Sequence, residues 1–167
     1  NYRPVSLTSV PCKIMESLIR EQMLEFLNSQ TQMTTEQHGF TRGKSCLTNL
    51  LEALEEWTKA LDDGFGLDIV FLDYQKAFDT VPHKRLLKKL KSYGISGNVL
   101  KWIEDFLLER KMRVVLNDSV TSWEQVLSGV PQGSVLGPLL FCCMSMIYQR
   151  WLNALLKCLL MTLRSGR

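Results

Sequence analysis

The sequence predicts an α+β fold. Four stretches place apolar residues at helical spacing, and they are accompanied by one strand-like run and one hairpin-like pair of runs. These elements do not alternate regularly as strand and helix, which argues against a parallel sheet. Of the 167 residues, 46% are hydrophobic and 22% charged, the composition of a globular protein rather than a disordered chain.

Two helices are expected in the first third of the chain. Residues 12–27 carry apolar side chains at helical spacing, and a polar loop then runs to Lys44. Ser45 is a favourable N-cap for a second, amphipathic helix, which the run Asp62-Asp63-Gly64 ends. The apolar residues of the two helices are Met15, Leu18, Ile19, Met23 and Phe26, and Leu47, Leu50, Leu51, Leu54, Trp57 and Leu61.

A strand is expected from Leu67 to Tyr74. Its alternation places Asp73 on the same face as Ile69 and Phe71. A carboxylate there is costly unless it meets a cation, a metal or a hydrogen-bond donor. On this pattern alone, a turn or cap role at the strand end is favoured for Asp73, and Asp79 is expected to cap the next helix.

The second half of the sequence predicts two short helices, a hairpin and a loop. The first helix is centred on residues 86–90 and stops at Gly94, and the second covers residues 99–107. The hairpin pairs Arg113–Leu116 with Val120–Val126 across the turn Asn117-Asp118. A glycine- and proline-containing loop, residues 129–133, precedes an apolar segment.

Charge and cysteine usage narrow the classes of protein. Net charge is +3, but no acid follows Cys142, so residues 1–141 carry 16 Lys and Arg against 17 Asp and Glu. Nucleic acid would therefore not be bound through a bulk positive field. Five cysteines without CxxC spacing, and no signal peptide, predict reduced thiols in an intracellular protein, nuclear or cytoplasmic. The apolar segment 135–148 is interrupted by Pro138 and too short for a membrane span.

Two glycine-containing motifs have competing interpretations. Residues 39–45 (GFTRGKS) have one residue too few between their glycines for a phosphate-binding P-loop, and no strand-like segment precedes them. A solvated basic loop is favoured, although a Gly-Lys-Ser at a helix N-terminus suits anionic oxygens. In residues 129–134 (GVPQGS), glycines allow close backbone approach and Gln132 can hydrogen-bond a ligand, but an ordinary turn also fits.

Five segments, in order, resemble the reverse transcriptases of LINE-like retrotransposons, the non-LTR elements of jockey or chicken-repeat type. The resemblance covers Asn1 to Phe141, and the third and fifth segments are the most specific. The segments are residues 1–7 (NYRPVSL), 39–45 (GFTRGKS), 70–83 (VFLDYQKAFDTVPH), 93–97 (YGISG) and 129–141 (GVPQGSVLGPLLF). The resemblance implies a partial right-hand polymerase fold, fingers plus an incomplete palm. Residues 1–65 would be fingers-like, 66–141 fingers and palm, and 142–167 a tail outside the family pattern.

The resemblance also assigns roles around the first catalytic motif. Asp73 matches the aspartate that holds two Mg2+ ions, and the carbonyl of Tyr74 matches a further ligand to one of them. Phe78 matches the aromatic residue beneath the nucleotide sugar, which excludes a 2′-hydroxyl. Two metals about 4 Å apart activate the primer 3′-hydroxyl and stabilise the leaving pyrophosphate, which requires several carboxylates.

Nucleotide contacts are implied elsewhere in the chain. Gln132, with Pro131 and Gly133, matches the loop that packs on the incoming nucleotide, and Arg42 and Lys44 fall where the family places cations for the triphosphate. The implied partners are an RNA template, a DNA primer and a deoxynucleoside triphosphate, with no membrane. The oligomeric state is not indicated.

After Phe141 the sequence departs from the family pattern. The family continues to an Asp-Asp pair that completes the metal site, whereas residues 142–167 contain no acid. We therefore expect a fragment of an RNA-directed DNA polymerase that is inactive as it stands and binds Mg2+ weakly or not at all. The alternative is a non-catalytic remnant that binds nucleic acid or a protein partner. A P-loop nucleotide hydrolase is a distant third, excluded if no strand precedes Gly43-Lys44-Ser45.

A single-base deletion near the codon of Phe141 would explain the departure. Read from the third base of that codon, Met146-Ile147 forces GAT and Met161-Thr162 forces GAC, both aspartate, where the family has its Asn-Asp and the end of its Phe-Ala-Asp-Asp. Sequencing the coding DNA across codons 139–167 is expected to spell that aspartate box in the shifted frame. A shifted frame without it would leave a new C-terminal helix, suggested by Trp151, Leu155 and Leu159, as the explanation.

Overall fold

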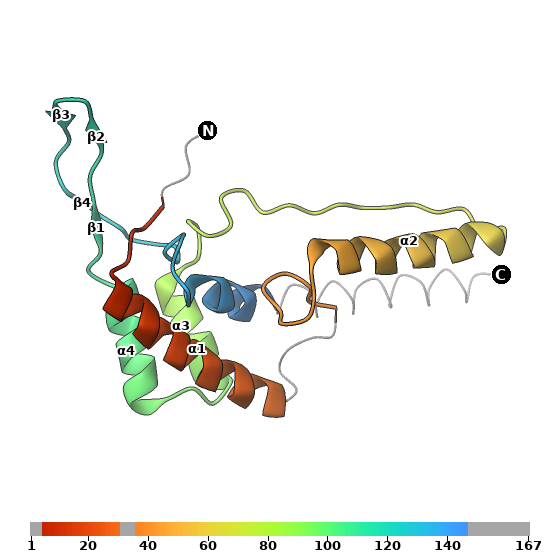
Figure 1. Cartoon of the computed structure of the whole chain (residues 1–167), viewed down its shortest axis with the longest axis horizontal. Helices are drawn as coiled ribbons and strands as arrows, with labels where there is room; N and C mark the ends of the chain where they lie inside the picture. Colours follow the sequence, from red (N-terminus) through yellow and green to blue (C-terminus); the bar gives the residue numbers. More distant parts are fainter. Residues whose placement is uncertain (1–4, 31–35, 147–167) are drawn as a thin grey trace. The chain divides into compact units, whose positions relative to one another are not determined.

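The computed structural model describes residues 5–30 and 36–146, which form two compact units (Figure 1). The first unit is built from residues 5–30 and 77–146, and the second from residues 36–76. Helices and short antiparallel ladders together make the α+β class that the sequence predicts.

Helices form the core of the first unit. They are α1 (Val10–Ser29), α3 (His83–Ser92), α4 (Gly97–Leu107) and a further helical segment, residues 137–146. Gly94, at φ 91°, ends α3 as predicted, since it adopts a left-handed conformation that glycine tolerates. The buried apolar side chains of this unit include Met23, Leu27, Leu86, Leu90, Ile103, Leu107, Leu136, Leu140 and Met146.

Helix α1 forms where residues 12–27 predict it, but its buried face is only partly the predicted one. Its fully packed residues are Glu16, Met23 and Leu27, which recur at helical spacing. Three of the residues expected on the apolar face, Met15, Leu18 and Phe26, are exposed. Met23 is buried as predicted, whereas Glu16 is buried beside it although a pattern of apolar residues leaves a carboxylate out.

The predicted hairpin is present as two short ladders along one ribbon. Strand β1 (Lys111–Met112) pairs with β4 (Glu124–Gln125), and β2 (Val115–Leu116) pairs with β3 (Ser119–Val120), both antiparallel. The turn lies at the predicted Asn117, at φ 51°. The pairing begins two residues earlier than the expected Arg113.

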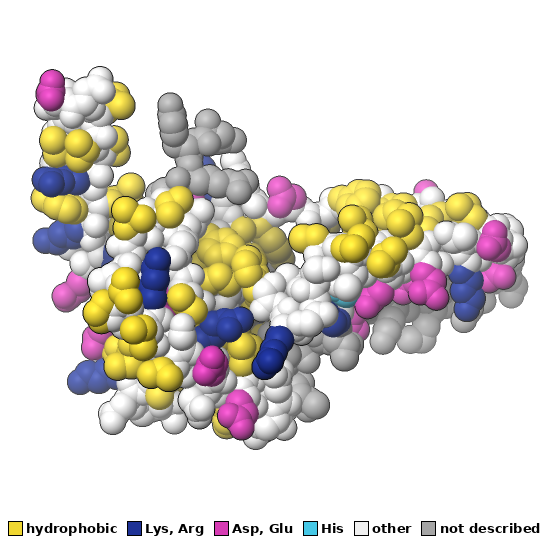
Figure 2. Space-filling model, viewed as in Figure 1, with side chains coloured by type: hydrophobic (Ala, Val, Ile, Leu, Met, Phe, Trp, Pro, Cys, Tyr) yellow, Lys and Arg dark blue, Asp and Glu magenta, His cyan; other side chains and the backbone are white. Residues whose placement is uncertain are grey.

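Helix α2 (Cys46–Asp62) gives the second unit its regular structure. The side chain of Ser45 accepts from the backbone N–H of Thr48 at 3.2 Å, and Thr48 returns the contact to Ser45, a complete capping box. None of the α2 side chains is buried, so its leucine face is exposed, and Figure 2 shows that face as an apolar patch over α2. The predicted cap and end of this helix are confirmed, whereas burial of its apolar face is not observed.

The expected strand from Leu67 to Tyr74 does not form. Residues 65–74 run without regular secondary structure after α2, and their side chains are exposed (Figure 1). A strand requires a neighbour to take its backbone N–H and C=O groups, and no described residue pairs with this segment. The prediction that Asp73 closes a strand and shares a face with Ile69 and Phe71 is therefore wrong, because its run is irregular and exposed.

Candidate functional site

The loop at residues 129–134 lies against the segment that follows Asp73 in the sequence. The backbone N–H of Gly129 donates to the carbonyl of Val81, and that of Val130 to the carbonyl of Phe78, each at 2.8 Å. The Ser128 hydroxyl donates to the carbonyl of Asp79 at 2.8 Å. Two of the most specific sequence motifs, some fifty residues apart, therefore meet within the first unit.

Gln132 is held at its side chain and at its backbone. Its Nε2 donates to Oδ1 of Asp79 at 2.8 Å, and its carbonyl accepts from the backbone N–H of Ser6 at 2.7 Å. Pro131 beside it is buried. Gly133 has φ 89°, and a Cβ there would lie 3.0 Å from the carbonyl oxygen of Ser6, so the close approach requires glycine. The loop is a braced structure rather than a free turn.

The expectation that Asp79 caps the following helix is wrong. Pro82 is the N-cap of α3, and no side chain caps that helix terminus. The Asp79 carboxylate instead accepts the Gln132 amide, because the Ser128 and Gly129 contacts bring the two segments together.

Phe78 contributes an aromatic surface beside the loop. Its ring stacks on that of Phe141, with centroids 4.9 Å apart and planes inclined by 17°. Phe141 belongs to the helical segment 137–146, so this stacking joins the first catalytic motif of the resemblance to the segment after the Gln132 loop.

Two basic side chains hold the start of the loop. Nε2 of His83 lies 2.8 Å from the carbonyl oxygen of Gly129, and a guanidinium nitrogen of Arg110 donates to the same oxygen. The His83 Nε2 must carry a proton to donate, so its 3.4 Å approach to Arg110 is a contact and not a second hydrogen bond. Burial lowers the pKa of Arg110 from its usual value.

Glu16 holds the far side of the loop. Its carboxylate is fully buried, and one oxygen accepts from the backbone N–H groups of Val135 at 2.7 Å and Leu136 at 2.9 Å. These are donors at the start of the helical segment 137–146, where a carboxylate both satisfies free N–H groups and meets the positive end of the helix dipole.

Asp73 and Tyr74 lie in the other unit, in the exposed run after α2. Gln132 belongs to the first unit. Residues 5–30 and 36–146 contain no cluster of three or more His, Cys, Asp or Glu side chains that could hold a metal ion. The described donors do not fit two Mg2+ ions, which require several carboxylates.

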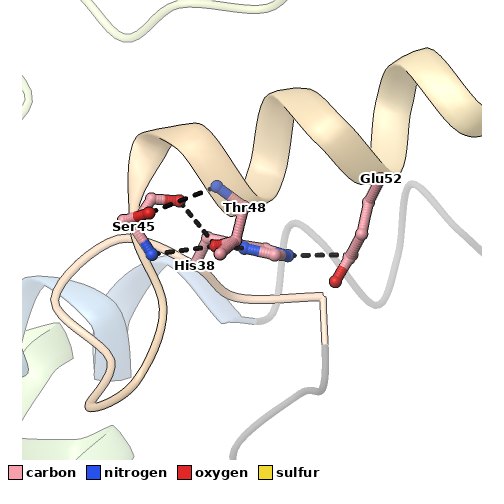
Figure 3. Close-up of polar contacts among 4 residues, drawn as sticks. All are labelled: His38, Ser45, Thr48 and Glu52. Atoms are coloured by element: carbon pink, nitrogen blue, oxygen red, sulfur yellow. Dashed lines mark hydrogen bonds and ion pairs between the residues drawn. The ribbon is translucent and has the colours of Figure 1, made fainter.

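Arg42 and Lys44 belong to the loop at residues 39–45, and His38, the residue before that loop, contacts α2 (Figure 3). The ring of His38 lies between Thr48, 2.9 Å from its Nδ1, and Glu52, 2.9 Å from its Nε2. His38 is buried although Glu52 is exposed. The residue before the loop at residues 39–45 is therefore held on α2, the helix that Ser45 caps at the other end of the loop.

In residues 5–30 and 36–44, the described part of the chain up to this point, no strand precedes the loop at residues 39–45. Residues 36–44 are turns and irregular backbone, so no described strand leads into the loop as the strand–loop–helix arrangement of a P-loop requires. By the criterion stated for it, the P-loop hydrolase interpretation is excluded.

The described cysteines are free thiols, as predicted. Burial raises the pKa of Cys142 to about 11 and that of Cys143 to about 12, so both stay protonated and unreactive at neutral pH. Cys158 lies outside the described residues. Within the described ranges, no helix combines the length and apolarity needed to cross a membrane.

The sequence does not predict the roles of Glu16, His38, His83 and Arg110, and it predicts a different role for Asp79. Glu16 carried one available signal, since it lies on the helical face of Met23 and Leu27. Asp79 was expected to cap a helix, whereas its carboxylate accepts from Gln132. The role of His38 could not be predicted from neighbouring residues, because its hydrogen-bond partners belong to α2.

Comparison with known proteins identifies the family. The family model described as reverse transcriptase (RNA-dependent DNA polymerase) matches residues 1–161, past the end of the resemblance at Phe141. The probable RNA-directed DNA polymerase from transposon BS of Drosophila melanogaster is 33% identical over 147 residues, covering 84% of this chain and 16% of that protein. That of the X-element from the same fly is 32% identical over 145 residues, 87% of this chain and 16% of the relative.

A third relative is the RNA-directed DNA polymerase from the mobile element jockey of Drosophila melanogaster. It is 33% identical over 141 residues, covering 84% of this chain and 15% of its own length. The chain thus spans about a sixth of the curated relatives it matches. The family match and these relatives agree with the order of motifs in the sequence. The chain belongs to the reverse transcriptase (RNA-dependent DNA polymerase) family, among the LINE-like, jockey-type enzymes of non-LTR retrotransposons.

Proposed function

We propose that this chain is the part of an RNA-directed DNA polymerase that receives the incoming deoxynucleotide, and that it does not transfer nucleotides by itself. The observation that carries the proposal is the contact of Gln132 with Asp79, which joins the loop at residues 129–134 to the segment after Asp73. In the intact enzyme the partners are an RNA template, a DNA primer and a deoxynucleoside triphosphate. The right-hand polymerase architecture, with residues 1–65 as fingers and 66–141 as fingers and palm, is part of the same proposal.

Each site residue has a role in this proposal. Asp73, with the carbonyl of Tyr74, contributes to holding the two Mg2+ ions of the intact enzyme, and Phe78 lies beneath the sugar. Gln132, with Pro131 and Gly133, packs on the nucleotide. Arg42 and Lys44 bind the triphosphate. The contacts of His38 with Thr48 and Glu52, which anchor the loop at residues 39–45, support that role.

Magnesium chemistry is incomplete in this chain. When bound, the two ions activate the primer hydroxyl and neutralise the leaving pyrophosphate. Asp73 alone cannot hold two closely spaced cations, and residues 142–167 offer no further carboxylate. The missing carboxylates support an inactive product. An origin of residues 142–167 in a shifted reading frame and an intracellular location are further parts of the proposal.

The purified chain is expected to extend no primer on an RNA template with Mg2+ or Mn2+. The physical reason is the missing second set of carboxylates, without which the metals that activate the primer hydroxyl are not held. Primer extension is measured with radiolabelled deoxynucleotides, with an Asp73→Asn variant as the matched control. Extension above background that Asp73→Asn abolishes would contradict the expected inactivity.

Binding separates this proposal from a remnant that binds only nucleic acid or a protein partner. A deoxynucleoside triphosphate should shift the resonances of residues 129–134 in an NMR titration. Shifts confined to other residues, or seen only with RNA, would favour the remnant.

A further inference from the structure

We propose that Asp79 is a positioning residue: it fixes which end of the Gln132 side-chain amide faces a bound nucleotide. This inference rests on the proposed function, because it assigns the amide a nucleotide to face. From the sequence alone, Asp79 is expected to be a helix cap.

The hydrogen-bond chemistry of the pair carries the first step. The two ends of a glutamine amide have nearly the same shape, but one donates and the other accepts. An ionised carboxylate only accepts, so Oδ1 of Asp79, 2.8 Å from Nε2 of Gln132, selects the NH2 end. The amide oxygen of Gln132 forms no hydrogen bond with any described residue and is left as an acceptor for a ligand.

Both partners are fixed by their backbones, so the selection holds. The carbonyl of Gln132 accepts from the backbone N–H of Ser6 at 2.7 Å. On either side of Asp79, the carbonyls of Phe78 and Val81 accept from the backbone N–H groups of Val130 and Gly129, each at 2.8 Å. At Gly129 a Cβ would lie 2.8 Å from the Cα of Asp79, so these two backbones are already in contact. The pair is also partly buried, which strengthens a charge-assisted hydrogen bond relative to one in water.

The fixed orientation has a consequence for the ligand. An amide oxygen accepts from a sugar hydroxyl or a base N–H, and it repels phosphate oxygens, which carry negative charge and accept. Asp79 therefore makes Gln132 a contact for the nucleoside part of the ligand. A glutamine free to turn would offer its NH2 to the phosphates as readily.

The first measurement is the hydrogen exchange of the Gln132 side-chain amide in the full chain, followed by NMR. We expect slow exchange in the wild type and in Ser128→Ala, the matched control that removes a contact to the Asp79 backbone and leaves its carboxylate. Asp79→Asn keeps the size of the side chain but offers a donor and an acceptor, so the amide should exchange rapidly. Equal exchange rates in all three proteins would overturn the proposal.

The second measurement compares thymidine triphosphate with inorganic tripolyphosphate as probes. Asp79→Asn should weaken thymidine triphosphate binding about fivefold, the difference between a charged and a neutral hydrogen bond, and leave tripolyphosphate binding unchanged. The double variant Asp79→Asn with Gln132→Glu reverses the pair at the same net charge. Its Asn amide donates to the new carboxylate, which still presents an oxygen to the ligand, so thymidine triphosphate binding should be restored.

Each remaining outcome has a defined meaning. Equal weakening of both probes by Asp79→Asn, or failure of the double variant to restore binding, would overturn the positioning role while the proposed function stands. A wild-type chain that binds neither probe contradicts the proposed function. In that case the hydrogen exchange of the Gln132 amide alone tests whether Asp79 positions it. Rapid exchange in the wild type would overturn the positioning role. Slow exchange in the wild type that becomes rapid in Asp79→Asn would support it.

Discussion

Replacing Gly129 by alanine is expected to lower the free energy of unfolding of the first unit by about 4 kcal/mol, the sum of backbone strain and overpacking. Gly129 has φ 90°, and a Cβ there would lie 2.8 Å from the Cα and carbonyl oxygen of Asp79 and from the carbonyl oxygen of Phe78. These are backbone atoms, which cannot turn aside as the end of a side chain can. Hydrogen exchange of peptides from α3, read by mass spectrometry, measures the change in stability.

Gly43→Ala is the matched control for this substitution. Gly43 has a similar φ of 77°, but nothing lies within 4 Å of a Cβ placed there. Only backbone strain of about 1 kcal/mol is expected, in the second unit. Equal losses in the two variants would show that the close contact with Asp79 and Phe78 does not exist in solution.

Removal of the Glu16 carboxylate has the second large expected effect. Glu16→Ala leaves the backbone N–H groups of Val135 and Leu136 buried without an acceptor, at a cost of about 4 kcal/mol for the two donors. Glu16→Gln retains an oxygen that can accept, so its cost should be about half. The measurement is again hydrogen exchange, here of peptides that contain residues 135 and 136.

Glu25→Ala on the same helix supplies the control for Glu16. Glu25 is exposed, and its loss should change stability by less than about 0.5 kcal/mol. If Glu16→Ala were as mild as Glu25→Ala, water would have to reach the start of the helical segment 137–146 and replace the carboxylate.

Local chemistry explains which elements the sequence predicts well. The cap at Ser45, the stop at Gly94 and the turn at Asn117 each depend on residues within a few positions, and all three occur where expected. The run from Leu67 to Tyr74 has the alternation of a strand, but a strand also depends on a distant neighbour, which local pattern does not encode.

The site follows the same division. Residues 129–134 could be named from their order and composition, and the structure places them beside the segment that follows Asp73. The partners that hold the loop could not be named. The carboxylates of Glu16 and Asp79 accept hydrogen bonds from donors more than fifty positions away in the sequence. The sequence around a carboxylate does not indicate so distant a partner.

The pairing of Glu16 with residues 135 and 136 also matters during biosynthesis. At about 5–20 residues per second, a ribosome needs roughly ten seconds to make the chain between these partners. Through that interval the nascent α1 segment carries a carboxylate destined for the interior, together with the apolar face of Met23 and Leu27. Translation that stops before residue 135 would therefore release a polypeptide in which the Glu16 carboxylate never meets the backbone N–H groups of Val135 and Leu136, a form suited to chaperone capture and proteolysis.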